Sequence, residues 1–440
     1  MTIKTITYPN GFRVVYEKIS NTTPVSCIEV MCDIGSIYEN NETRGVSHFI
    51  EHMCFKGTKN IPIPKNIFLE YDKIGAYLNA TTDKRYTYYT IKCSNKYVEN
   101  SINIMSDMLL NSTFNKSEYK KEEKVVIEEN IKGVNDAEEI LFENLDKLLY
   151  NGSSYAFPVD TIAYHKGNLD YNKVLEMYNY FYQPNKMVLS IVSNLQFNHV
   201  KQMIEHTLFV KQNISQMQIP NKYPVYSFVL PQNEIQYNIQ KQNEIATGHI
   251  AIGFRTNYCD KYALDLLKVI LSGPMSSRLF MLLREENGLT YTSRVSHDYY
   301  DLLGEFIFYA ETDSTKIMKN GSKSGVLPLI IHLINELIKR GITDDELKLA
   351  KNYLKGDMEI DLEDNEKLAL HNGEKLLVYP NEKIIPYSKI YDTFYKNITK
   401  KDIETVIRKY LNKKNMSVCI ISEKLPSLDK VKEQCEKIIS

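Results

Sequence analysis

The order of apolar and polar residues predicts a chain in which short strands alternate with amphipathic helices. Period-two alternation and β-branched runs indicate strands, and apolar residues that recur every three or four positions indicate helices. In the first half the expected strands are 13–17, 25–30, the stretch around Asn79, 86–93 and 187–192. The expected helices there are 97–111, 115–132, 138–150 and 197–208.

The second half repeats this order. Its expected strands are 234–241, 248–254, a pair between 290 and 309, and 416–421. Its expected helices are 260–272, 326–340, 343–362 and 364–377. The sequence therefore predicts an α+β protein with two homologous α/β-sandwich units of about 210 residues, each a mostly antiparallel sheet with helices packed on it.

A segment of different composition separates the two copies. Residues 211–231 are rich in Gln, Asn, Pro and Ser and lack helical periodicity, which is typical of a linker. We therefore predict an N-terminal unit at 1–212, a linker at 213–231 and a C-terminal unit at 232–440.

The most informative motif is H-x-x-E-H, formed by His48, Glu51 and His52. It reverses the zinc-protease motif H-E-x-x-H. Histidines four residues apart lie on one face of a helix, so both imidazoles can reach one Zn²⁺. Glu51 would then lie beside the open metal position and could take a proton from an attacking water. The plainer alternative is an amphipathic helix with two surface histidines.

Catalytic zinc normally has three protein ligands, so a third is needed. Glu122 and Glu129 are seven residues apart in a stretch of helical composition, and therefore lie on one face of that helix. One carboxylate could bind the metal while the other orients a histidine. Taken alone, the stretch also fits a solvated, charged helix.

These segments match a known family. Residues 45–58 read G-V-S-H-F-I-E-H-M-C-F-K-G-T, which resembles the pattern G-x-[AS]-H-[FL]-[LI]-E-H-x-x-F-x-G-T of the pitrilysin/insulinase-type inverzincins. The resemblance is strongest to members of similar length, such as the mitochondrial processing peptidase subunits and their bacterial relatives. Residues 122–129 match the family's E-x-x-[VI]-[VI]-x-x-E helix.

The resemblance implies a zinc metalloendopeptidase with one Zn²⁺ per chain. His48, His52 and Glu129 become the metal ligands, and Glu51 becomes the general base. Glu122 becomes a helper that orients a ligand. The same ligand set could also hold Mn²⁺ or Co²⁺.

Residues 75–82, G-A-Y-L-N-A-T-T, resemble the family's G-G-x-x-N-A-x-T strand, which lines the cleft. An edge strand there can bind an extended peptide through main-chain hydrogen bonds. The resemblance makes Asn79 and Ala80 substrate contacts. An ordinary strand rich in Tyr and Thr is the simpler reading, and the two are compatible.

Residues 273–291 resemble the family's G-G-[GP]-M-S-S-R-L-F-x-x-[LI]-R-E-x-x-G-L-x-Y segment. The resemblance makes Arg284 and Tyr291 groups that face the zinc from across a chamber. A guanidinium and a phenol can anchor the substrate main chain and stabilise an oxyanion. Without the family match, a surface salt bridge would be the expected role of Arg284.

The resemblance also implies an assembly. In the family four such units form a clamshell, so this chain would be half of a closed chamber. Because the chain carries both the H-x-x-E-H motif and the Arg/Tyr pair, we expect a homodimer, with pairing to a homologous subunit as the alternative. The substrate would be a peptide or unfolded polypeptide, and a peptidase for one dedicated leader is a further possibility. A non-catalytic structural or assembly subunit is the competing function.

Composition excludes several other classes. The 54 basic and 55 acidic residues nearly balance, so a nucleic-acid partner is not expected. No apolar run is long enough for a membrane span. Seven cysteines, an odd count without C-x-x-C, suit free thiols in a reducing compartment. With no secretory or transit signal evident, we expect a cytoplasmic protein.

Overall fold

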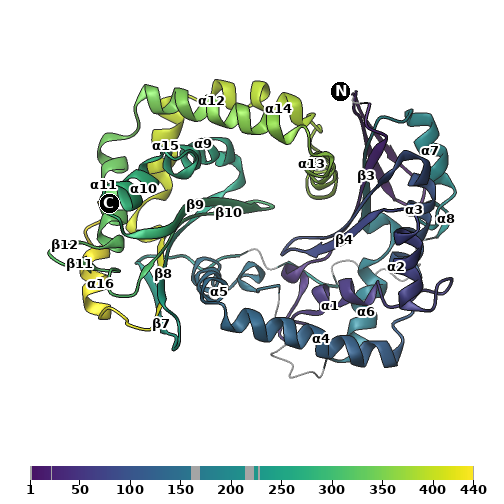
Figure 1. The fold of residues 1–440 in the computed structure, drawn as a ribbon, viewed down its shortest axis with the longest axis horizontal. Helices are drawn as coiled ribbons and strands as arrows, with labels where there is room; N and C mark the ends of the chain where they lie inside the picture. Colours follow the sequence, from purple (N-terminus) through teal and green to yellow (C-terminus); the bar gives the residue numbers. More distant parts are fainter. Residues whose placement is uncertain (1, 21, 160–168, 214–221, 226–227, 440) are drawn as a thin grey trace. The chain divides into compact units, whose positions relative to one another are not determined.

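The computed structural model describes residues 2–20, 22–159, 169–213, 222–225 and 228–439 (Figure 1). They form two compact α/β units, so the predicted fold class is confirmed. Unit 1 comprises Met1–Lys132, Phe157–Tyr226 and Glu359–Lys389, and unit 2 comprises Gly133–Ala156, Ser227–Met358 and Ile390–Ser440.

Each unit thus contains a segment from the other half of the chain. The predicted linker, 213–231, falls partly outside the described residues. The boundaries 1–212 and 232–440 describe the repeat in the sequence, and they stay a prediction.

The sheet of unit 1 has six strands in the order β1-β2-β6-β3-β5-β4. Its strands are β1 (Thr2–Thr7), β2 (Arg13–Lys18), β3 (Val25–Cys32), β4 (Tyr77–Thr82), β5 (Thr87–Ser94) and β6 (Met187–Ser193). Only β2 and β6 pair in parallel, and every other pair is antiparallel. Both β1 and β4 are therefore edge strands, and β4 belongs to the segment in which a substrate-binding strand was expected.

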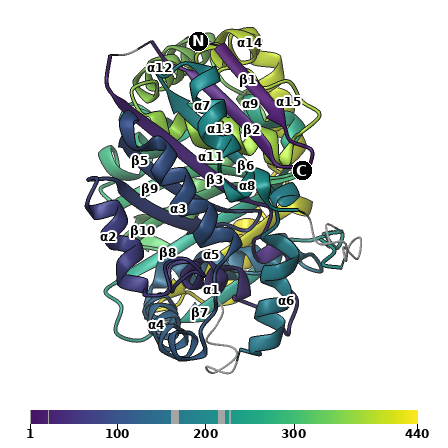
Figure 2. The ribbon, with the colours of Figure 1, turned by 90° about the vertical axis from the view of Figure 1, so that its right-hand side faces the viewer.

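One face of this sheet carries the main apolar core of unit 1. The helices of its first two segments are α1 (Val46–Met53), α2 (Pro64–Asp72), α3 (Val98–Leu110), α4 (Lys116–Asn135), α6 (Tyr171–Phe181), α7 (Phe197–Glu205) and α8 (Leu208–Lys211). Figure 2 shows α3, α7 and α8 in front of this face. Apolar residues at helical spacing, such as Ile102, Met105 and Leu109 of α3, are fully buried there.

The opposite face is covered by α13 (Asn365–Val378), a helix from the second half of the chain (Figure 1). Its Leu368 and Leu377 pack against Val192 and Met31 of the sheet. Gly373 lies at the closest approach, because a Cβ there would meet the Met31 Sδ at 2.5 Å. The absence of a side chain therefore lets the helix lie directly on the strands.

Two buried carboxyl groups lie on this α13 face. Glu17 accepts a hydrogen bond of 2.7 Å from Nδ2 of Asn372 on α13. Glu29 accepts bonds of 2.9 Å from the Thr90 hydroxyl. Burial raises the pKa of Glu29 to about 8, against the lowering effect of the bond from Thr90. Glu29 is therefore mostly protonated at neutral pH.

Unit 2 repeats the arrangement with five strands in the order β7-β13-β8-β10-β9. They are β7 (Gln236–Lys241), β8 (Thr247–Asn257), β9 (Thr290–Tyr300), β10 (Leu303–Asp313) and β13 (Met416–Ser422). The strand β13 pairs in parallel with β7 and antiparallel with β8, as β6 does with β2 and β3. The expected correspondence of 416–421 with 187–192 is thus confirmed.

The helix α5 (Ala137–Leu149), from the first half of the chain, packs on the sheet of unit 2. The remaining helices are α9 (Lys261–Ser272), α10 (Arg278–Phe280), α11 (Val326–Arg340), α12 (Asp344–Asp361), α14 (Tyr387–Thr393), α15 (Lys400–Tyr410) and α16 (Leu428–Cys435), and a small hairpin is formed by β11 (Lys319–Asn320) and β12 (Lys323–Ser324). No helix among the described residues is both long and apolar enough to cross a membrane.

The raised pKa of Glu29 predicts a pH-dependent stability. The pKa of Glu29 is 4.5 in the unfolded chain and about 8 in the folded state, so between these pH values only the folded state binds the proton. The free energy of unfolding therefore falls as pH rises through that window. Glu29→Gln, which is always neutral, should match the wild type near pH 4.5. It should be more stable at pH 8, by on the order of a few kcal/mol.

Urea unfolding at several pH values tests this, with the exposed Glu423→Gln as control. Parallel stability curves for Glu29→Gln and wild type would contradict it.

Candidate metal centre

The helix α1 carries His48, Glu51 and His52, and a buried carboxylate holds its first turn. The helix follows Gly45, whose φ of 77° lies in the left-handed region and which has no side chain to cap it. Glu39 instead accepts hydrogen bonds from the backbone N–H of Gly45 (2.7 Å) and Ser47 (2.8 Å). A carboxylate at a helix N-terminus also interacts favourably with the helix dipole.

Glu39 is only 2% exposed. Burial raises its pKa to about 7, although the bonds from Ser47 and Gly45 oppose this rise. The orientation of α1 therefore depends on a polar contact with a residue outside the H-x-x-E-H motif.

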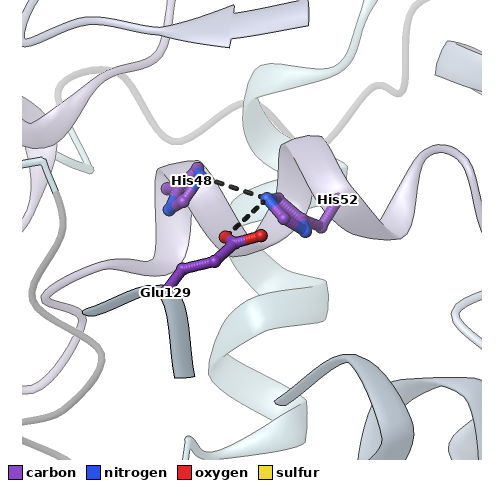
Figure 3. Close-up of side chains that lie close together, drawn as sticks. All are labelled: His48, His52 and Glu129. Carbon is purple, nitrogen blue, oxygen red and sulfur yellow. Dashed lines mark hydrogen bonds and ion pairs between the residues drawn. The ribbon is translucent and has the colours of Figure 1, made fainter. Parts of the chain in front are cut away.

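The side chains of His48, His52 and Glu129 converge. One ligand atom from each lies within 4.8 Å of the other two. Figure 3 shows the carboxylate of Glu129, from α4, turned toward both imidazoles. The Nε2 atom of His52 is 3.1 Å from Nε2 of His48 and 3.5 Å from Oε2 of Glu129.

These separations fit tetrahedral zinc. Two atoms about 2.1 Å from one Zn²⁺ at tetrahedral angles are about 3.4 Å apart, close to both observed distances. Two imidazole nitrogens and one carboxylate oxygen are also a donor set found in catalytic zinc sites. The three residues could therefore hold Zn²⁺ and leave a fourth position for water or substrate.

A second carboxylate orients His52. Glu122 accepts a bond of 2.9 Å from Nδ1 of His52 and pairs with the Lys56 ammonium at 2.7 Å. Burial acts to raise the pKa of Glu122, but the bonds from His52 and Lys56 outweigh it and lower the pKa. An ionised Glu122 can only accept, so Nδ1 of His52 carries the proton and Nε2 presents its lone pair.

Glu51 lies on the same helix and is 8% exposed. Its Oε2 accepts a hydrogen bond of 2.6 Å from the Thr82 hydroxyl. Glu51 lines a pocket of about 260 Å³, whose other lining residues are His52, Phe55, Lys56, Phe68, Leu78, Asn79, Ala80 and Glu122. The pocket therefore joins the metal helix to the edge strand β4, with Asn79 exposed and Ala80 half-buried.

The sequence also matches family models. That for insulinase, peptidase family M16, matches residues 13–159, and that for the peptidase M16 inactive domain matches 168–354. The chain is 30% identical over 376 residues to the uncharacterized zinc protease YmxG of Bacillus subtilis, covering 83% of this chain and 86% of that one.

The chain belongs to peptidase family M16. It is also 32% identical over 203 residues to the mitochondrial-processing peptidase subunit beta of Caenorhabditis elegans, covering 45% of this chain and 43% of that one. A protease from Helicobacter pylori has the same fold, with a TM-score of 0.86 at 21% identity, covering 96% of this chain and 99% of that one. Membership implies a zinc cofactor, and the resemblance inferred from the sequence is confirmed.

The region matched by the M16 inactive domain includes Arg284 and Tyr291, which lie in unit 2. Arg284 donates to the backbone oxygen of Tyr291 at 3.3 Å, and Tyr291 is 80% exposed. Both line a pocket of about 430 Å³, together with Lys316 and Asp313. The two residues are thus neighbours, and their role toward zinc stays a prediction.

Three residues that contact the candidate site were not identified from the sequence. Lys56 belongs to the F-K-G-T end of the motif segment and lies just past the end of α1, so the motif match is a usable signal. Thr82 closes the matched strand segment. Glu39 lies six residues before Gly45 in irregular backbone, and no periodicity connects the two.

The contact of Glu39 with α1 predicts a specific variant. Glu39→Gln should lose one of the two side-chain oxygens that accept from the backbone N–H groups of α1, because the amide nitrogen cannot accept. Loss of a helix cap costs about 0.5–2 kcal/mol, so the melting temperature should fall. Zinc affinity, measured by competition with a chromophoric chelator, should also fall, because His48 and His52 lose their orientation.

Glu17→Gln is the matched control, since Glu17 is equally buried in unit 1 but lies on the α13 face. It should leave zinc affinity unchanged. Equal zinc affinities for both variants and wild type would contradict the role of Glu39.

Proposed function

We propose that this M16 chain is a zinc-dependent endopeptidase that hydrolyses peptides or extended polypeptide segments in a closed chamber. The observation that carries the proposal is the convergence of His48, His52 and Glu129, with Glu51 buried on the same helix and lining the adjoining pocket. When bound, Zn²⁺ supplies a Lewis acid that polarises the peptide carbonyl and lowers the pKa of a water molecule.

The protein's own groups handle the proton. In the proposed reaction the Glu51 carboxylate takes a proton from the attacking water and then gives it to the nitrogen of the leaving amine. Glu122 and Lys56 keep His52 in the tautomer that presents Nε2. Glu51 is therefore neutral only between the two transfers.

The edge strand β4 supports binding of an extended substrate. It pairs with β5 on one side only, so its other side offers backbone groups to an added strand. Asn79 and Ala80 lie on this strand and line the pocket. The pocket wall formed by Phe55, Phe68 and Leu78 suits an apolar substrate side chain.

Pairing of two chains follows from the resemblance to four-unit members of the family. This chain has two units, and one of its M16 relatives is named a subunit. We propose a homodimer in which Arg284 and Tyr291 of one chain serve the zinc centre of the other, with a homologous subunit as the alternative partner. The exposure of Tyr291 supports this, because its phenol is available to a group outside unit 2.

We propose the cytoplasm as the compartment. All seven cysteines are free thiols, and six of them are buried. Free thiols in this number suit a reducing environment.

Replacing the base tests the proposed activity. Glu51→Gln should keep its zinc, because Glu51 is not among the three converging ligands, and should lose cleavage of a mixed peptide pool read by mass spectrometry. The loss should be at least about a hundredfold. Glu128→Gln, an exposed position on α4, is the control and should cleave normally.

Cleavage by Glu51→Gln at the wild-type rate would refute the role of this residue. If neither wild type nor variant cleaves any peptide although zinc is bound, the non-catalytic subunit is favoured.

Pairing is tested by mixing two inactive variants. If Arg284 acts on the partner's zinc, Glu51→Gln and Arg284→Ala chains should complement each other, because a mixed dimer holds one complete site. Random reassortment would restore about a quarter of wild-type activity. Continued inactivity after subunit exchange, with mixed dimers confirmed by native mass spectrometry, would contradict this arrangement.

A further inference from the structure

The hydroxyl that contacts Glu51 belongs to a cross-strand threonine pair. Thr82 ends β4, Thr87 begins β5, and the two are direct partners in the antiparallel register. Their hydroxyl oxygens are 3.2 Å apart. The Thr82 hydroxyl also donates to Oε2 of Glu51 at 2.6 Å, so the hairpin contacts the side chain assigned as the base.

The second threonine is fixed by a hydrogen bond of its own. The Thr87 hydroxyl donates to the backbone oxygen of Ile34 at 3.0 Å. Thr87 and Ile34 are both 0% exposed, so water does not compete for this bond. A carbonyl oxygen can only accept, which commits the single proton of the Thr87 hydroxyl to Ile34. Thr87 is therefore held rigidly, and it packs beside Thr82.

The bond from Thr82 distinguishes the two oxygens of Glu51. Thr82 holds Oε2, and Oε1 is the other oxygen of the carboxyl group that a proton can occupy. With the proton on Oε1, Oε2 becomes a carbonyl-type oxygen and still accepts from Thr82. The same bond thus persists before and after proton uptake, and it stops the carboxyl group from rotating between the two transfers.

We propose that Thr82 is a positioning residue for Glu51, with Thr87 as its fixed neighbour. The inference rests on the proposed function, in which Glu51 receives a proton from water and returns it to the leaving amine nitrogen. Thr82 keeps its own proton throughout. It acts by holding the protonated Oε1 where the nitrogen departs, which serves the chemical step and not substrate binding.

A purely structural role makes a different prediction. Cross-strand threonine pairs also stabilise hairpins, and loss of such a pair lowers stability without a selective effect on turnover. The two roles therefore separate in the kinetic constants.

The experiment compares Thr82→Val with Thr82→Ser in the full-length protein. The valine is nearly isosteric and lacks the hydroxyl, whereas the serine restores it. Thr82→Val should lower kcat by about tenfold or more and leave KM within about twofold. Thr82→Ser should recover most of kcat, and the zinc content of both variants should equal that of wild type.

The matched control is Thr90→Val on the neighbouring strand β5, whose hydroxyl donates to Glu29 on the opposite face of the sheet. It should lower the melting temperature and leave kcat unchanged. Wild-type kcat in Thr82→Val, or an equal loss in Thr90→Val, would overturn the role of Thr82.

Wild type and Glu51→Gln are measured alongside. If wild type cleaves and Glu51→Gln does not, a normal kcat in Thr82→Val counts against the positioning role alone. If wild type itself does not cleave, the proposed function fails, and the role of Thr82 fails with it.

Discussion

The hydrogen bond between Nδ1 of His52 and Glu122 is the contact on which the metal centre depends. The Nε2 atoms of His48 and His52 lie close together. A proton on either Nε2 atom would occupy the lone pair with which that nitrogen would bind a metal. The ionised carboxylate of Glu122 accepts a hydrogen bond from Nδ1 of His52, so the single proton of this imidazole lies on Nδ1. Burial acts to raise the pKa of Glu122, and Lys56, together with His52, lowers it and so favours the ionised form. The contact also joins α1 to α4, which brings Glu129 to the histidines.

A similar constraint shapes the rest of unit 1. The sheet has one apolar face and one face that carries Glu17 and Glu29, and buried carboxyl groups are tolerated only with hydrogen-bond partners. The cover, α13, supplies Asn372 as a partner for Glu17 and Gly373 for close approach. Because this helix comes from the second half of the chain, the unit that carries His48, His52 and Glu129 is incomplete without residues more than 200 positions away. Residues from the first half of the sequence are therefore not sufficient to form unit 1.

Much of this was predictable because it depends on local order. The helices at 326–340, 343–362 and 364–377 were expected within one or two residues of where they occur, since their apolar periodicity is strong. The His48, His52 and Glu129 cluster was predicted from motif spacing and a family resemblance, and the three side chains do converge. The packing of α5 and α13 on the sheet formed mainly by the other half of the sequence was not predictable. Amphipathic periodicity shows that a helix has a buried face but not which sheet covers it. Glu39 and Thr82 were missed for the same reason, since each acts through a contact formed only in the folded chain.

The missed residues bear on the choice between a peptidase and a non-catalytic subunit. The first turn of α1, Glu51 and His52 have polar partners from three other parts of the chain, which are Glu39, Thr82 and Glu122 respectively. An assembly subunit needs α1 only as a packing element, and apolar residues would serve that purpose at lower cost than buried carboxylates. Partners that set a tautomer and the rotation of a carboxylate are of direct use where those groups bind a metal or move a proton. The arrangement of these partners, more than the motif itself, therefore supports the peptidase.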